Sequence, residues 1–368
     1  MAKSPQHPAA ESSEISLLNK PGMIVHSSRF LELEMPMSAL TSWITPLQHF
    51  FVRSHAPEPI ALDPTTWTIK VCGEVERPFN LTMADVSQFP PASVTNTLEC
   101  AGNGRHFLAS GIPGSQWQRG AIGTAVFSGI RLQEVLLRAG IKSSGKHVSF
   151  RGLDQLPGEV PPFIRSIPIE KALHPDTLLA TSMNHAPLQK VHGFPIRALV
   201  PGWIGAASVK WLTEICVLQQ ESQSEFMTQS YRMPTRSLQP GETASVQDSI
   251  AITKLPVKSI IVRPLHGDNL KVGPMEIMGA AWAGENDITR VDVSTDNGLT
   301  WDRARLVNDR APYCWRFWSY AWRPNEIGQY ILMSRASDSA GRVQPLAGTW
   351  NPGGYLYHAT DRVQINVG

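Results

Sequence analysis

Residues 251–368 constrain the fold most, because this part of the chain reads as a series of short strands with no helical pattern between them. The strand-like runs are 258–262, 276–282, 289–294, 300–306, 315–320, 330–334 and 361–367. Between the third and fourth runs, Asp296-Asn297-Gly298 is a strong hairpin signal, since Asn-Gly accepts the positive φ angles of a tight turn. Short strands at this spacing predict an all-β, immunoglobulin-like sandwich that serves binding or assembly.

The preceding part of the chain has a mixed pattern. Residues 129–140 place apolar side chains at helical spacing and end at a glycine, which predicts a helix. Residues 66–72 and 147–150 alternate like strands. Residues 219–249 are polar and rich in Gln, Ser and Thr, so we expect a connecting arm there.

These patterns predict an α+β chain of two domains. With 368 residues the chain exceeds one domain of about 100–200 residues. We expect a disordered tail over 1–20, a mixed α/β domain over 21–250 whose last part, 219–250, is the arm, and the all-β domain over 251–368.

Composition excludes several classes of protein. The 33 Lys and Arg residues nearly balance the 31 Asp and Glu residues, which argues against a nucleic-acid-binding protein. No apolar run approaches the roughly 20 residues of a membrane-spanning helix, so we expect no membrane insertion. The first residues show no export signal. The sequence as written therefore predicts a cytoplasmic protein, or a periplasmic one if a signal was removed.

The segment 97–105 holds the cysteine with the greatest chemical interest. A strand-like run leads to Cys100, and glycines at 102 and 104 allow close approach of the backbone. Arg105 brings positive charge near the sulfur, which predicts an easily ionised thiolate. Such a thiolate serves as a nucleophile or a soft metal ligand, while the alternative is a buried cysteine at an ordinary strand-to-turn junction.

Two other segments carry polar side chains suited to anion binding. Arg53 and His55 lie on the same side of an extended, proline-flanked stretch. The segments 192–197 and 208–211 offer a histidine, an arginine, a hydroxyl and a lysine around glycine-rich turns, which would suit a phosphate and ring nitrogens. Taken singly, each is also compatible with a structural role.

Together, and in this order, these segments resemble the sulfite oxidase family of molybdenum enzymes. The matching motifs are FVRSH at 51–55, CAGN at 100–103, GLD at 152–154, HGFPIR at 192–197 and SVKW at 208–211. The resemblance implies a Mo-molybdopterin cofactor, with Cys100 as the protein ligand to molybdenum. It also implies that the pterin and its phosphate are held by Phe51, Val52, Arg53, Ser54, His55, Cys100, Asp154, His192, Arg197, Ser208, Val209 and Lys210.

The same resemblance places Arg53, Arg105 and Trp117 around an oxyanion substrate, and the sequence departs from the family in that pocket. Phe163 aligns with the family's active-site tyrosine, and Gly353 aligns with an arginine near the C-terminus. A less cationic and larger pocket is therefore expected, with Arg165 as a candidate replacement for the missing charge.

The implied reaction is oxygen-atom transfer that oxidises sulfite, or a related small sulfur oxyanion, to sulfate. The altered pocket leaves open sulfane sulfur, nitrate or an S-oxide as substrate, and a non-catalytic assembly protein is the remaining alternative. No CxxCH haem-attachment motif is present, so the resemblance implies an external electron acceptor, either a cytochrome c-like protein or a small oxidant. It also implies a homodimer formed by the C-terminal domain, whose aromatic residues either fill the sandwich core or form an apolar dimer face.

Overall fold

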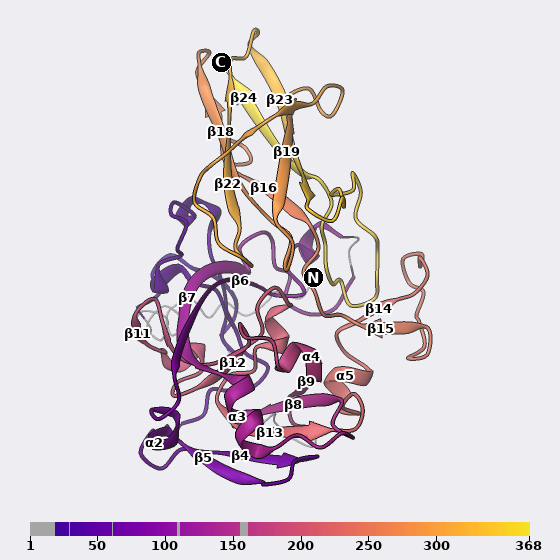
Figure 1. Cartoon of the computed structure of the whole chain (residues 1–368). Coiled ribbons are helices and arrows are strands. Elements are labelled where there is room, and N and C mark those ends of the chain that lie inside the picture. The colour runs from indigo at the N-terminus through magenta and orange to yellow at the C-terminus, as the bar shows by residue number, and fades with distance from the viewer. Residues whose placement is uncertain (1–18, 29, 61, 109–110, 155–160) are drawn as a thin grey trace, which may run out of the picture.

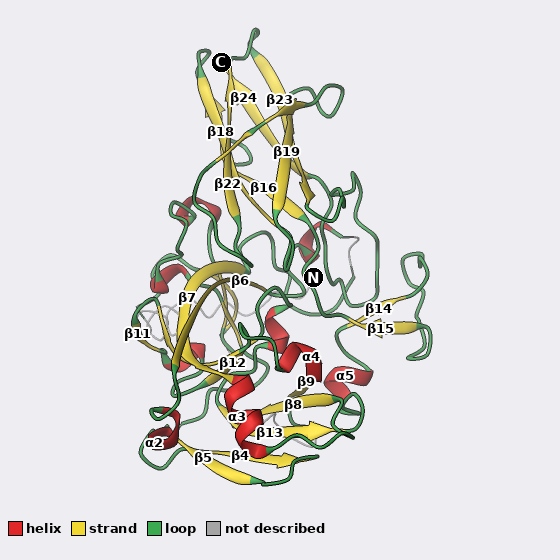
Figure 2. Cartoon of the chain, viewed as in Figure 1, coloured by secondary structure: helices red, strands yellow, loops and turns green. Residues whose placement is uncertain are grey.

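The computed structural model describes residues 19–28, 30–60, 62–108, 111–154 and 161–368. Nearly all of the expected tail over 1–20 lies outside these residues. Figure 1 shows the rest of the chain as a lower body, formed by the N-terminal two thirds, and an upper body of long strands. Helices are few and short, as Figure 2 shows, and the predicted α+β class is confirmed. No helix among the described residues is long and apolar enough to span a bilayer.

The lower body contains three larger sheets and one hairpin, whose strand orders are β1-β2-β3, β11-β10-β7-β6 with β12 paired to β10, β5-β4-β13-β8-β9, and β14-β15. The strands are β1 (Ile24–Ser27), β2 (Glu32–Glu34), β3 (Val52–Arg53), β4 (Thr68–Gly73), β5 (Phe79–Thr82), β6 (Pro91–Glu99), β7 (Ile122–Arg131), β8 (His147–Gly152), β9 (Ile164–Pro168), β10 (Leu178–Met183), β11 (Ala186–Pro187), β12 (Arg197–Leu199), β13 (Leu212–Leu218), β14 (Arg232–Pro234) and β15 (Ser249–Ala251).

Short helices connect these strands. The α-helices are α2 (Met83–Val86), α3 (Leu132–Ala139), α4 (Ile169–Ala172) and α5 (Glu225–Thr228), and the 3₁₀ helices are η1 (Met37–Ala39), η2 (Leu47–His49), η3 (Arg105–Phe107), η4 (Lys190–His192) and η5 (Gly205–Ala207). The helix predicted over 129–140 is α3, but it begins only at Leu132 because the preceding residues complete strand β7. The predicted arm contains α5 and the β14-β15 hairpin, which projects from the body in Figure 1.

The upper body consists of two sheets, with orders β16-β18-β22-β21 and β17-β24-β23-β19-β20. The strands are β16 (Lys258–Arg263), β17 (Asn269–Leu270), β18 (Met275–Trp282), β19 (Ile288–Ser294), β20 (Asp302–Arg303), β21 (Arg305–Leu306), β22 (Arg316–Trp322), β23 (Gly328–Asp338) and β24 (Asp361–Val367). One predicted strand, 300–306, is wrong as a single element. It divides into β20 and β21, which pair in different sheets.

The two bodies are joined by a common hydrophobic core. Trp203 and Tyr231 of the lower body belong to the same buried cluster as Ile260, Trp282 and Trp315 of the upper body. The indole of Trp315 donates to the carbonyl of Trp43, and Trp43 donates back to the carbonyl of Trp315, at 2.8 and 3.0 Å. Trp315 therefore packs between the domains rather than on an exposed face. Trp318 fills the core of the sandwich itself.

Candidate functional site

Cys100 is presented by a rigid turn at the end of β6. This strand pairs with β7 along its whole length, and the register continues into the turn, where the Cys100 amide donates to the Ala121 carbonyl at 2.9 Å. The Asn103 amide closes the turn by donating to the Cys100 carbonyl at 2.9 Å. Because both backbone groups of Cys100 are bonded, the position of its side chain is fixed by the sheet.

Two cavities meet at this cysteine. The first encloses about 740 Å³ of empty space and the second about 730 Å³, each partly open to solvent. The side chains that line both cavities are Arg53, His55, Cys100 and Tyr231. Segments far apart in the sequence therefore converge on one place.

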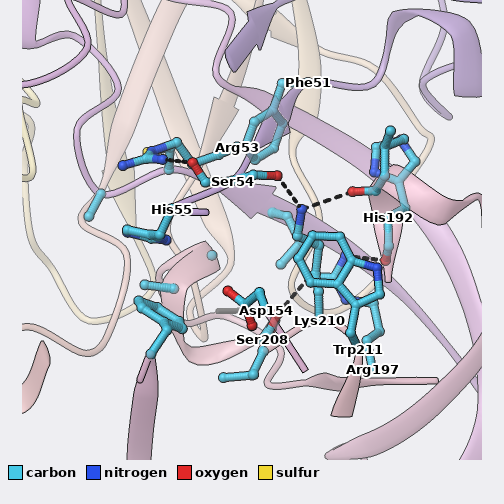
Figure 3. A pocket seen from close by; sticks show the side chains of 18 of the residues that line it. Phe51, Arg53, Ser54, His55, Asp154, His192, Arg197, Ser208, Lys210 and Trp211 are labelled. Atoms are coloured by element: carbon cyan, nitrogen blue, oxygen red, sulfur yellow. Dashed lines mark hydrogen bonds between the residues drawn. The ribbon is translucent and has the colours of Figure 1, made fainter. Parts of the chain in front are cut away.

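The first cavity gathers the residues that the sequence assigned to a cofactor (Figure 3). All of them line it except Val52, which is buried in the core beside it. Phe163 also lines this cavity, where its ring stacks on His55 at 4.3 Å between centroids. The strand β3, the turn after β8 and the segments around η4 and η5 thus enclose a single space.

Positive charge dominates the first cavity. Lys210 donates to the Ser54 hydroxyl and to the Val191 carbonyl, both at 2.9 Å. Arg197 donates to the carbonyls of His192 and Ser208 at 3.0 and 2.7 Å. Burial lowers the pKa of Lys210 to about 7 and that of Arg197 to about 10. Among the described lining residues, Asp154 alone is acidic, so positive charge is in excess. The cavity is therefore suited to an anionic ligand.

The second cavity places two guanidinium groups near Cys100. Arg53 pairs with Glu32 at 3.0 Å. Arg105 donates to the Gly353 carbonyl at 2.9 and 3.1 Å and to the Ser115 carbonyl at 2.8 Å. Trp117, also predicted for this pocket, is fully buried, and its indole nitrogen has no hydrogen-bond partner among the described residues.

Tyr231 was not predicted from the sequence. Its hydroxyl lies 2.6 Å from His55 Nε2, and the residue lines both cavities. It sits in the polar segment expected to be a connecting arm, where no motif marks it. What marks Tyr231 in the structure is its backbone φ of +56°, an unusual conformation for a residue with a large side chain.

Electrostatics corrects one prediction about Cys100. The sequence predicted an easily ionised thiolate, but desolvation in the pocket raises the pKa of the Cys100 thiol, and the nearby Arg53 opposes this only in part. The charge of Arg105 also lowers the pKa of this thiol, but by less than the charge of Arg53 does. His55 is also affected: desolvation, and then the charge of Arg53, hold its pKa well below the usual value, so the ring is neutral.

Family models match both parts of the chain. Residues 55–226 match the oxidoreductase molybdopterin binding domain, and residues 249–368 match the Mo-co oxidoreductase dimerisation domain. The sulfite oxidase of Gallus gallus is 38% identical over 359 residues, which is 93% of this chain and 77% of that protein. The chain belongs to the sulfite oxidase family of molybdopterin oxidoreductases.

Other members of this family differ in their substrates. The nitrate reductase [NAD(P)H] of Hordeum vulgare is 35% identical over 364 residues, covering 91% of this chain and 40% of that protein. The crystal structure of the sulfane dehydrogenase SoxCD from Paracoccus pantotrophus superposes with a TM-score of 0.79 and 27% identity, covering 98% of this chain and 92% of that one. The family, the enzyme class and the Mo-molybdopterin cofactor predicted from the sequence are confirmed.

The first cavity fits this cofactor. His192 Nε2 is buried without a hydrogen-bond partner among the described residues, and it faces a space lined by cations with little counter-charge. A phosphate there would pair with Lys210 and Arg197 and raise their lowered pKa values again. Within the described residues no cluster of three or more His, Cys, Asp or Glu side chains could hold a metal ion.

The two expected departures from the family have different outcomes. Phe163, which aligns with the family's tyrosine, lines the first cavity and stacks on His55, and Tyr231 brings a hydroxyl to the same histidine from another segment. Gly353 does line the second cavity, and the ring of Tyr355 fills the space that a side chain at 353 would need.

Arg165 does not replace the missing charge in the pocket lining. Its guanidinium is buried behind Tyr231, 5.0 Å from that ring, and donates to the carbonyls of Phe226 and Ile252. Arg165 therefore supports the segment that carries Tyr231.

Proposed function

We propose that this protein oxidises sulfite to sulfate at a molybdenum centre held by Cys100 and passes the electrons to an external acceptor. The observation that carries the proposal is the convergence of Arg53, Arg105 and Tyr231 with Cys100 on the second cavity. Two guanidinium groups and a phenol beside a metal-binding thiol suit a small tetrahedral or pyramidal oxyanion.

In this proposal the first cavity binds the cofactor and the second binds the substrate. When bound, the Mo-pyranopterin supplies two-electron oxygen-atom transfer. Arg197, Lys210 and Ser208 would hold the cofactor's phosphate, and Cys100 would hold the metal as a thiolate, since a coordinating thiol is deprotonated. Arg53 and Arg105 orient the oxyanion, and the buried Tyr231, whose pKa is raised by desolvation, keeps its proton to donate a hydrogen bond.

Metal analysis and kinetics test this proposal together. Cys100→Ser should lose molybdenum, while Arg53→Ala and Arg105→Ala should retain it and show a higher KM for sulfite. Cys314→Ser is the matched control, because Cys314 lies outside both cavities. A sulfite kcat/KM below about 10² M⁻¹s⁻¹, far under the usual enzyme range of 10⁴–10⁸, would reject sulfite as substrate.

A sulfane sulfur substrate is the second candidate, favoured by the similarity to SoxCD over almost the whole chain. Gly353 and Tyr355 give the pocket an aromatic wall, which suits a sulfur atom that carries less negative charge than sulfite. Parallel assays with sulfite, thiosulfate, a protein persulfide, a small S-oxide and nitrate discriminate these candidates. The substrate with the highest kcat/KM identifies the reaction.

We also propose that the protein is a homodimer formed through residues 251–368, supported by the match of this region to a dimerisation domain. Sedimentation equilibrium should give twice the 40.5 kDa of one chain, and a mass of one chain would contradict this.

For the electron acceptor, cytochrome c and ferricyanide should both support turnover, with no haem absorbance from the purified chain itself.

A further inference from the structure

A buried ion pair joins the two domains directly beside Cys100. Lys258 is the first residue of β16 in the C-terminal domain, and Glu99 is the last residue of β6, one position before Cys100. Lys258 Nζ lies 2.9 Å from Glu99 Oε1, and the two side chains are only 4% and 5% exposed. Since neither charge reaches bulk water, each depends on the other for compensation.

The Glu99 carboxylate receives two more hydrogen bonds. Asn103 Nδ2 donates to Oε1 at 2.9 Å, and the indole of Trp282 donates to Oε2 at 2.7 Å. Trp282 is the register partner of Lys258 across strands β16 and β18. Two of the three donors to this carboxylate therefore come from adjacent positions in the C-terminal domain.

The same groups hold both ends of the turn that carries Cys100. Lys258 Nζ also donates to the Asn103 carbonyl at 3.3 Å, and the Asn103 amide donates to the Cys100 carbonyl. Residues 99 and 103 are thus both anchored to Lys258. A shift of this lysine would move the two ends of the turn and with them the direction of the Cys100 side chain.

We infer that Lys258, together with Trp282, is a positioning residue for the molybdenum site, so that the C-terminal domain builds part of that site in addition to any role in dimerisation. This rests on the proposal that Cys100 binds the metal. Without Lys258, the buried Glu99 carboxylate would keep only neutral donors and would move toward water, which changes the turn.

A double-mutant cycle tests the inference. Lys258→Gln and Glu99→Gln each leave one buried charge unpaired, whereas the double variant places two neutral amides that can bond to each other and to Trp282. We expect each single variant to lose at least about tenfold in bound molybdenum per chain. In cofactor-free protein, the alkylation rate of Cys100 by iodoacetamide, followed by mass spectrometry, should rise by a similar factor. The double variant should return close to wild type in both.

A second ion pair between the domains provides the control. Lys171 of α4 pairs with Glu285 at 2.6 Å, and neither residue lines the cavities at Cys100. Lys171→Gln should lower the melting temperature without changing molybdenum content or Cys100 alkylation. The thiolate-to-molybdenum charge-transfer absorption of the loaded enzyme is a further readout, since general destabilisation would not shift its wavelength.

The inference is overturned if Lys258→Gln keeps its molybdenum, its absorption band and the wild-type alkylation rate. It is also overturned if the double variant is as impaired as the single ones. Should Lys258→Gln not fold, Trp282→Phe removes only the indole donor, and an unchanged band and alkylation rate in that variant would contradict the inference. Retention of molybdenum by Cys100→Ser would instead reject the assignment of Cys100 as the metal ligand. The alkylation rates of the Lys258 and Glu99 variants would still show whether Lys258 positions the Cys100 side chain.

Discussion

Tyr231 lies where the two cavities meet, and its environment fixes both its place and its protonation. Its ring stacks on Tyr355 at 5.2 Å, and its hydroxyl bonds to His55. Desolvation raises the pKa of the phenol and lowers the pKa of His55, so both groups are neutral at physiological pH. A neutral pair can hold a proton beside Cys100 without adding a charge to the pocket.

Tyr231→Phe removes this hydroxyl and keeps the ring. We expect kcat/KM for the preferred substrate to fall about tenfold or more, which corresponds to one hydrogen bond to a charged partner. Molybdenum content should not change. Tyr320→Phe is the matched control, because that hydroxyl bonds to Asp302 on the surface of the sandwich. Equal kinetics for the two variants would show that the Tyr231 hydroxyl does not act on the substrate.

Lys20 shows how a buried charge makes stability depend on pH. Its ammonium is fully buried, donates to the carbonyls of Leu47 and Phe50, and has a pKa lowered to about 7 by desolvation. Between pH 7 and about 10.5 the unfolded chain binds this proton and the folded chain does not. Stability from this group therefore increases as pH rises through that window.

The size of this effect can be measured with Lys20→Met. Across pH 7 to 9 the wild-type protein should gain on the order of 2 kcal/mol in unfolding free energy relative to the variant. Urea unfolding at several pH values gives the difference. A constant difference between wild type and variant over this range would show that Lys20 stays protonated in the folded protein.

At the scale of elements, the loop over 351–356 shapes the second cavity. Asn351 holds it by accepting from the Tyr355 amide and donating to the Tyr355 carbonyl, both at 2.9 Å. The Leu356 amide donates to the Ala101 carbonyl at 2.8 Å, next to Cys100. The C-terminal domain thus reaches the site through this loop as well as through β16.

Gly353→Ala tests the close packing of this loop. A Cβ at 353 would overlap the ring of Tyr355, so the ring and the Gly353 carbonyl that holds Arg105 must move. We expect KM for the oxyanion to rise about tenfold, equivalent to about 1.4 kcal/mol of binding, with kcat less affected. An unaltered KM in Gly353→Ala would show that Arg105 does not bind substrate.

At the scale of the whole molecule, the shared core makes the two domains one folding unit. Trp203, Trp282 and Trp315 lie in one buried cluster across the junction, and Lys171 pairs with Glu285 over it. Separation of the domains would expose these indoles to water.

Calorimetry should accordingly show a single cooperative unfolding transition for the cofactor-free protein, with calorimetric and van't Hoff enthalpies in agreement. Two resolved transitions would indicate that each domain is stable without the other. Lys171→Gln should lower the single midpoint rather than split it, because many apolar contacts across the junction remain.

Much of this architecture followed from local patterns. The strands of the sandwich, the turn after β6 and the cations around η4 and η5 are marked by alternation, glycines and short motifs. Tyr231 was missed because a backbone with positive φ and packing from distant segments bring it to the site. The easily ionised Cys100 was wrongly predicted because sequence shows that Arg105 is near, but not that burial of the thiol raises its pKa by more than the nearby charges lower it.

The meeting of two cavities at Arg53, His55, Cys100 and Tyr231 has a consequence for how the enzyme matures. A pterin seated in the first cavity would form one wall of the second, so the substrate pocket is complete only after the cofactor is loaded. Oxyanions should therefore bind weakly to newly synthesised chains, and cofactor insertion should precede any competition from substrate.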